Sequence, residues 1–161
     1  MALTLSSNSF NDGDYLDKKH SLSSDFGFGC DGNNQSPELH WEGAPHGTRS
    51  FALTCYDPDA PIGSGFWHWV VVNIPQDALS ITEGPNSLPH AALETRTDFG
   101  RPGYGGPCPP QGDHPHRYIF TLFSLSVDSL PVKYDTSAAL VGFMLNQNTI
   151  ERATLMGFFK R

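Results

Sequence analysis

The sequence predicts a single, mainly β domain with one short helix near its C-terminus. Among its 161 residues are 16 glycines and 13 prolines, while charged residues make up only 17%. Helical bundles and coiled coils show the opposite balance, rich in charge and poor in helix breakers. Eleven Phe, five Tyr and three Trp residues can build a core, so the chain is not of the disordered type. The length fits one domain, which we expect to span residues 1–161.

Strands are expected where aromatic and β-branched residues run between prolines and glycines. The run at 50–56 alternates large apolar with small or polar side chains and stops at Asp57. Two of the three strongest runs are nearly continuous in apolar residues, a pattern typical of central strands covered on both faces. Including two weaker candidates, we expect strands at residues 39–41, 50–56, 67–74, 117–125 and 154–160.

One helix is expected from Ser137 to Gln147. Three consecutive N-cap candidates precede it, and four apolar side chains follow at helical spacing: Leu140, Val141, Met144 and Leu145. Residues 8–37 are rich in turn-forming Gly, Asn and Asp. About forty residues between Ile74 and Arg117 show no clear element, and loops of such length are usually functional.

Charge and cysteine content restrict the partners and the compartment. The net charge of −7 argues against nucleic acid, which needs a cationic surface. No apolar run is long enough for a membrane span, and the N-terminus does not resemble a signal peptide. Three cysteines, Cys30, Cys55 and Cys108, cannot all pair within the chain. Such an odd and sparse set suggests reduced thiols and a cytoplasmic protein.

Ionisable side chains stand at the ends of the three strongest strands. Asp57 and Asp59 follow the first, His68 opens the second, and His116 and Tyr118 open the third. In an extended chain, residues two apart point to the same side. If the three strands are neighbours, these five polar groups meet at one rim of the sheet. The Gly- and Pro-rich loop before His116 is suited to aim backbone N–H groups at a ligand.

Taken singly, each of these residues has a simpler interpretation: an aspartate before proline is usually a turn residue, and a histidine in an aromatic strand usually belongs to the core. Their coincidence in three separate segments favours a shared site, because burying such a set without use costs several kcal/mol. Two motif matches are discarded. The G-x-G-x-x-G match at 27–32 has no strand before it or helix after it, and Asp98-Phe99-Gly100 lacks the other kinase motifs.

The ordered motifs resemble the phosphatidylethanolamine-binding protein family, also called the Raf kinase inhibitor-like proteins, and in particular its short bacterial branch. The resemblance rests on Asp57-Pro58-Asp59-Ala60-Pro61, on His68 to Ile74, and on Gly106 to Gly112 with His116-Arg117-Tyr118. It implies a β-sandwich with a small anion pocket at one end. It further implies these ligand-binding residues: Asp57, Asp59, His68, Pro110, Gly112, His116 and Tyr118. Cys108 stands where many relatives carry glycine, and neither His114 nor the remaining cysteines have an assigned role.

The expected function is non-catalytic binding of a small anion or phosphoryl headgroup, with a regulatory role through a protein partner. No cofactor and no bound metal are expected. Both histidines are expected to lose their charge as pH rises near 6.5, weakening anion binding. Two alternatives stay open: a hydrolase or metal-dependent enzyme using the Asp and His residues, and an inhibitor of a protease or kinase. Phe66, Trp67 and Trp69 suggest a surplus of aromatic side chains, which predicts a homodimer.

Overall fold

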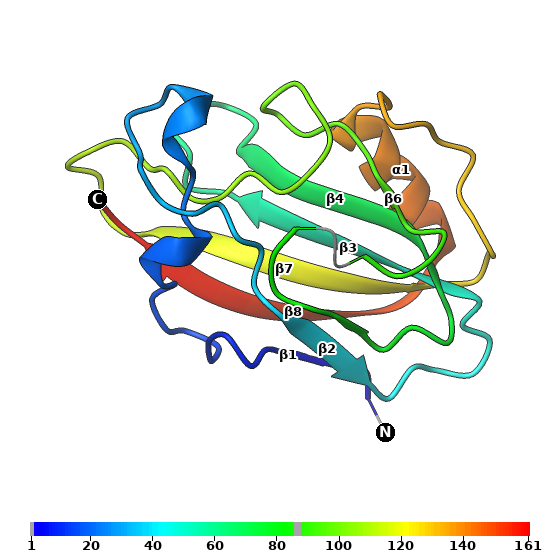
Figure 1. Ribbon diagram of the computed structural model, residues 1–161. Coiled ribbons are helices and arrows are strands. Elements are labelled where there is room, and N and C mark those ends of the chain that lie inside the picture. Colours follow the sequence, from blue (N-terminus) through cyan, green and yellow to red (C-terminus); the bar gives the residue numbers. More distant parts are fainter. Residues whose placement is uncertain (1, 86–87) are drawn as a thin grey trace.

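Two antiparallel sheets form the body of the protein (Figure 1). The computed structural model describes residues 2–85 and 88–161. The large sheet has the strand order β6-β4-β3-β7-β8 and the small sheet the order β1-β2-β5. The large sheet consists of β3 (Ser50–Asp57), β4 (Phe66–Pro75), β6 (Leu93–Glu94), β7 (His116–Leu125) and β8 (Thr149–Phe159). The small sheet consists of β1 (Thr4–Ser6), β2 (Leu39–Glu42) and β5 (Ser80–Ile81). The predicted mainly β, sandwich-like domain is confirmed.

Both faces of the central strands are buried, as the apolar runs predicted. Along β3, Phe51 and Leu53 point into the core between the two sheets, whereas Ala52 points to the opposite face. The same alternation separates Val71 from Val70 in β4. This period of two is the reason these segments form strands, since each step along the chain turns a side chain to the other face.

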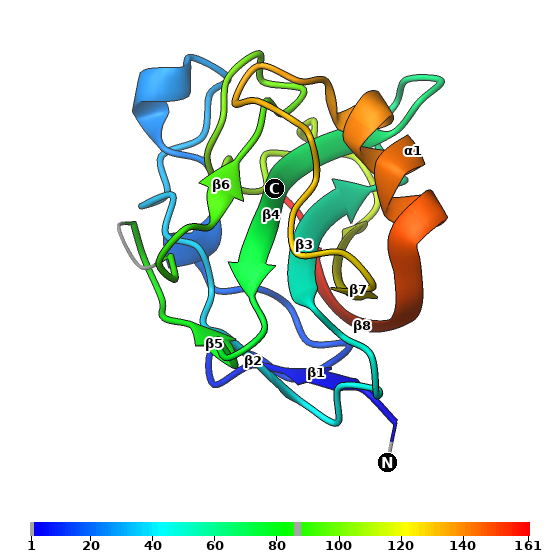
Figure 2. The same ribbon diagram turned by 90° about the vertical axis from the view of Figure 1, so that its right-hand side faces the viewer.

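The second face of the large sheet is covered by α1 (Ala138–Asn148), which Figure 2 shows on the far side from the small sheet. Its N-cap is Ser137, whose hydroxyl accepts a hydrogen bond from the Leu140 N–H at 3.2 Å. Val141 and Leu145 are buried against the sheet, but Leu140 is 47% exposed. The predicted position of the helix is therefore confirmed, but the helix buries a narrower stripe of apolar side chains than the sequence pattern suggested.

The long segments without predicted elements contain short ones. Residues 8–37 include two 3-10 helices, Lys18–His20 and Ser24–Phe26. The stretch between Ile74 and Arg117 contributes β5 to the small sheet and β6 to the large one. The last strand begins at Thr149, five residues earlier than expected, because β8 pairs with β7 along its full length. Within the described ranges, no helix has the length and apolar character needed to cross a bilayer.

Candidate ligand pocket at the end of the large sheet

The ionisable strand ends meet at one edge of the large sheet, as predicted. Because β3 runs antiparallel to both β4 and β7, its last residue lies beside the first residues of its neighbours (Figure 1). Asp57 pairs with Phe66 at the start of β4, and Tyr56 pairs with Ile119 near the start of β7. This arrangement brings Asp57, His68, His116 and Tyr118 around one hollow of about 200 Å³.

His116 lies between two carboxylates. Its Nδ1 is 2.7 Å from Asp57 Oδ2 and its Nε2 is 2.9 Å from Asp113 Oδ2. Both ring nitrogens can donate at once only in the imidazolium form. Burial alone would lower the pKa of His116, but the hydrogen bonds to Asp57 and Asp113 outweigh burial and raise this pKa above 6.5. The two carboxylates therefore favour the cationic form of His116, and both of its ring nitrogens are already engaged by the protein.

His68 has the opposite electrostatic setting. Its Nδ1 donates to the Gly105 carbonyl oxygen at 2.7 Å, and its ring is surrounded by Phe66, Phe99 and Tyr118. Burial lowers the pKa of His68 below 6.5 despite that hydrogen bond. In the part of the chain that the structure describes, His68 Nε2 has no hydrogen-bond partner. The neutral ring thus presents a free nitrogen lone pair, and the protonated ring presents a free N–H.

Tyr118 completes the polar floor of the hollow. Its side chain is only 1% exposed, and burial followed by the negative charge of Asp57 raises the pKa of its hydroxyl. The phenol therefore remains protonated over the whole physiological pH range and can act as a hydrogen-bond donor.

Asp59 lies beside the pocket, but its carboxylate is engaged elsewhere. Since β3 ends at Asp57, the chain turns there, and the Asp59 N–H donates to Asp57 Oδ1 at 2.8 Å. The Asp59 carboxylate accepts from the Arg117 backbone N–H and from its guanidinium at 2.8–3.0 Å. Arg117 accordingly lowers the pKa of Asp59 to about 2. The expectation that both carboxylates point to one side fails, because residues 57 and 59 do not share one extended segment.

The rim of the pocket is apolar. It consists of the following side chains: Leu22, Phe28, Ala60, Pro61, Ile62, Phe66, Phe99, Cys108, Pro109 and Pro110. Pro110 lines this pocket, and its role in ligand binding stays a prediction. Gly112 is exposed and does not line it; its φ of +92° lets the loop turn back toward His116. Further upstream, the loop passes close to the body at Gly106, where a Cβ atom would collide with the carbonyl oxygen of His20.

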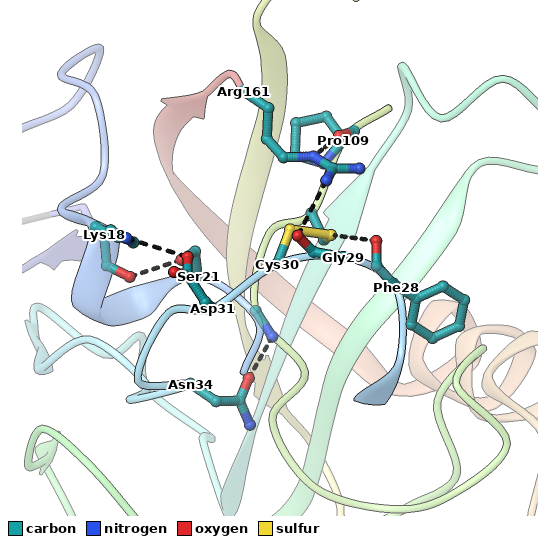
Figure 3. Close-up of a disulfide and its surroundings, with 11 residues drawn as sticks. Lys18, Ser21, Phe28, Gly29, Cys30, Asp31, Asn34, Pro109 and Arg161 are labelled. Atoms are coloured by element: carbon teal, nitrogen blue, oxygen red, sulfur yellow. Dashed lines mark hydrogen bonds and ion pairs between the residues drawn. A yellow bond between two sulfur atoms is a disulfide. The ribbon is translucent and has the colours of Figure 1, made fainter. Parts of the chain in front are cut away.

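A disulfide joins Cys30 to Cys108 and corrects the expectation of reduced thiols. The two residues are 78 positions apart, and their Cα atoms lie 6.0 Å from each other. Sequence spacing does not reveal the bridge because the fold alone brings the Gly27–Gly32 turn to the loop before His116 (Figure 3). Cys55, which is buried in β3, is the free cysteine.

Asp113 is the functional candidate that the sequence prediction missed. It lies three residues before His116 and binds the ring nitrogen that Asp57 does not reach. An acidic residue at this spacing before a strand-opening histidine was the available signal. Phe99 was likewise missed, and its ring packs edge-on against His68 at 5.4 Å between centroids. Among the described residues, no three His, Cys, Asp or Glu side chains are grouped to hold a metal ion.

The same fold occurs in known proteins. The sequence model of the phosphatidylethanolamine-binding protein family matches residues 6–160. The Escherichia coli proteins YbcL and YbhB, both described as UPF0098 proteins, are 48% and 45% identical over 159 and 161 residues. These alignments cover 96% and 98% of this chain, and 85% and 99% of the relatives.

Solved structures agree with the sequence relatives. The crystal structure of YbcL, described as a new member of the mammalian PEBP family, superposes with a TM-score of 0.95 at 44% identity and covers 100% of this chain and 99% of YbcL. A Chlamydia trachomatis protein described as a putative PEBP homolog gives a TM-score of 0.84 at 29% identity, covering 99% and 98% of the two chains. From its sequence motifs and its architecture alike, this chain belongs to the phosphatidylethanolamine-binding protein family.

Proposed function

We propose that the pocket between Asp57, His68, His116 and Tyr118 binds a small phosphoryl or carboxylate group without transforming it. The observation that carries the proposal is a set of four buried polar side chains around a hollow that opens to solvent. Within this set, the Tyr118 hydroxyl and, once the ring is protonated, His68 Nε2 supply donors for a ligand oxygen. Desolvating these groups costs free energy, and a bound anion offsets part of that cost through charge-assisted hydrogen bonds.

The net charge of the pocket depends on pH and controls the affinity for an anion. With Asp57 and Asp113 ionised and His116 cationic, a neutral His68 leaves one net negative charge, which opposes an anion. Protonation of His68 brings the net charge of the pocket to zero. Because burial lowers the pKa of His68 below 6.5 and the carboxylates raise that of His116 above it, His68 is the first of the two to lose its proton as pH rises. We therefore expect anion affinity to fall as pH rises through the His68 pKa, rather than through a common titration of both histidines.

Pocket size restricts the ligand. A hollow of about 200 Å³ has room for a phosphoryl group with a short substituent, such as phosphoethanolamine, but not for acyl chains. The apolar rim suits the carbon atoms of such a substituent. An ammonium group would be attracted by the carboxylates that surround His116.

Calorimetric titration with sulfate and with phosphoethanolamine between pH 5 and pH 8 tests the proposal. Sulfate keeps its charge over this range, so its affinity reports the protein alone. We expect sulfate affinity to be highest at pH 5 and to be lost in His68→Ala. His40→Ala is the matched control, because His40 lies on β2, outside the pocket, and is half exposed. Equal sulfate affinity from pH 5 to pH 8, or in the wild type and His68→Ala, would refute the proposal.

Other functions are less well supported by the geometry. A zinc enzyme would need free ring nitrogens, yet both nitrogens of His116 face carboxylates. Metal analysis of the purified protein separates this alternative, since stoichiometric zinc lost in His68→Ala would favour it. A protease or kinase inhibitor would act through a partner-binding surface rather than through this pocket alone.

We also infer that the protein works in a compartment oxidising enough to maintain the Cys30–Cys108 bridge. Cytoplasmic location was the expectation from the sequence, and the disulfide favours the opposite. Alkylation of free thiols in cells before lysis, followed by mass spectrometry, tests this inference. Labelling of Cys30 and Cys108 in the untreated cell would contradict it.

A further inference from the structure

We propose that the Cys30–Cys108 disulfide is a reducible brace on the wall of the ligand pocket, so that its reduction lowers ligand affinity. The inference rests on the proposed anion-binding function and adds a means of controlling it. It starts from the position of the bridge, which joins two loops that both contribute side chains to the pocket rim (Figure 3).

The bridge connects the rim residues directly. Phe28, two residues before Cys30, lines the pocket, as do Cys108 itself and the next two residues, Pro109 and Pro110. The sulfur of Cys108 lies 3.6 Å from the Phe28 carbonyl oxygen, so the two loops are in contact at the bridge. Phe28 is 58% exposed, and its ring packs edge-on against Phe99 at 5.9 Å between centroids.

Upstream of Cys108, the pocket loop is held without the disulfide. The Pro107 carbonyl accepts from the Leu22 N–H at 3.0 Å, and the Gly106 N–H donates to Asn34 Oδ1 at 2.7 Å. The Gly105 N–H donates to the His68 carbonyl at 3.0 Å. Breaking the bridge therefore leaves the floor around His68 in place and acts on the rim.

Downstream of Cys108, the ties are fewer. The Arg161 guanidinium donates to the Pro109 carbonyl at 2.7 Å and to the Gly29 carbonyl at 3.4 Å, spanning the same two loops as the bridge. Figure 3 shows Arg161 reaching both carbonyl groups beside the sulfur atoms. The hydrogen bond to Pro109 is part-buried and the longer one to Gly29 is exposed, so this one side chain ties the two loops less firmly than a covalent bond. The covalent bridge is the principal link that keeps the rim assembled.

The bridge is also chemically suited to opening. Cys108 is partly exposed, whereas Cys30 is buried, so an incoming thiolate meets the Cys108 sulfur first. Cys30 lines a hollow with Lys18, Asp31, Lys160 and Arg161, and because Asp31 pairs with Lys18 at 3.1 Å, the two other cations leave the hollow net positive. Positive charge there favours the thiolate that must leave from Cys30.

The co-reactant is a dithiol reductant. Its thiolate attacks Cys108 Sγ, the S–S bond breaks, and its electron pair leaves on Cys30 Sγ. The second thiolate of the reductant then attacks the mixed disulfide and releases Cys108. The reductant ends as a disulfide, and both cysteine sulfurs take up a proton, so two electrons enter the protein.

When the bridge is open, ligand binding must order the loosened side chains of the rim, which costs conformational entropy. Ordering one or two loosened side chains corresponds to an affinity loss of about three- to tenfold. The coupling is reciprocal, because a ligand that prefers the bridged form must stabilise the bridge by the same factor. A fivefold loss corresponds to a shift of the reduction potential by about 20 mV in the presence of saturating ligand.

The test is calorimetric titration of phosphoethanolamine at pH 5 into three forms: oxidised protein, protein reduced with dithiothreitol, and the Cys30→Ala/Cys108→Ala variant. We expect the last two to bind about three- to tenfold more weakly than the first, and the double variant to be indifferent to reductant. Cys55→Ala is the matched control, because it removes the free thiol and keeps the bridge. Circular dichroism verifies that every form is folded.

The outcomes separate the two proposals. Equal affinity of the oxidised and reduced forms overturns the brace and leaves anion binding intact. Absence of binding in the oxidised form overturns both. Hydrogen exchange provides a readout without a ligand, because the Asp113 N–H donates to the Pro110 carbonyl at 3.1 Å within the pocket loop. Reduction should speed exchange of the Asp113 amide while the amides of β3 and β4 are unchanged, and unchanged exchange at Asp113 would refute the brace whatever the titrations show.

Discussion

Replacing Asp57 with asparagine removes the charged partner of His116 while keeping the size of the side chain. The two groups are almost completely buried and meet at 2.7 Å. Removing one member of a buried pair typically costs about 3–5 kcal/mol, because the other charge is left uncompensated. Here the low end applies, since Asp113 still accepts from the other ring nitrogen. We expect Asp57→Asn to lower the free energy of unfolding by about 3 kcal/mol, or Tm by about 6–12 °C.

The pKa of His116 also predicts how the stability loss in Asp57→Asn depends on pH. The pKa of His116 is raised in the folded protein above its ordinary value of 6.5. Its stabilising contribution is therefore fully present below pH 6.5 and is lost as pH rises through the higher folded pKa. The difference between the wild type and Asp57→Asn should consequently be largest near pH 6 and shrink toward pH 9.

Urea unfolding followed by tryptophan fluorescence at several pH values measures both quantities. Asp59→Asn is the matched control, because its partner Arg117 is 47% exposed and such pairs contribute less than about 1 kcal/mol. The reasoning is refuted if Asp57→Asn costs no more than Asp59→Asn, or if its cost does not change with pH.

Three further predictions concern stability and assembly. Leu145→Ala should cost about 2–4 kcal/mol in urea unfolding, because the side chain is buried under α1, whereas Leu140→Ala on the exposed side should change stability by less than about 0.5 kcal/mol. A similar cost for both would contradict the observed helix face. Ser137→Ala should cost about 1 kcal/mol through loss of the N-cap, and an unchanged unfolding midpoint would argue against the cap. The homodimer remains a prediction: light scattering after size exclusion should give twice the chain mass of 17.6 kDa, and a monomer mass at micromolar concentration would refute it.

The basis for the homodimer changes with the structure. Trp69 is buried within the chain, and Trp67 packs against Tyr56. These aromatic side chains are therefore largely packed within a single protomer. The exposed large apolar side chains instead include Leu140 and Phe143 on α1. Substituting Phe143 with lysine, beside the wild type in the scattering experiment, indicates whether this face carries any association.

Strand identity was predictable because it depends on local alternation of side chains. The runs containing Phe51, Val71 and Phe120 were found where the structure places them, and Ser137 marked the start of α1 within one residue. Convergence of Asp57, His68, His116 and Tyr118 was also predictable, since polar residues at the ends of adjacent antiparallel strands must share an edge. The short strands β5 and β6 escaped because two residues carry too little pattern to be recognised.

What the local sequence could not determine was how the polar groups divide between partners. Asp59 turned to Arg117, Asp113 took one nitrogen of His116, and Cys30 met Cys108 across 78 residues. Each of these depends on a distance between segments remote in the chain, which no local periodicity encodes. The same holds for the two histidines: their identity came from the sequence, but burial of one and carboxylate contacts of the other set their pKa values apart. Hydrophobic patterning therefore determined the sheets of this protein, and only the packed fold decided which polar atoms remain free for a ligand.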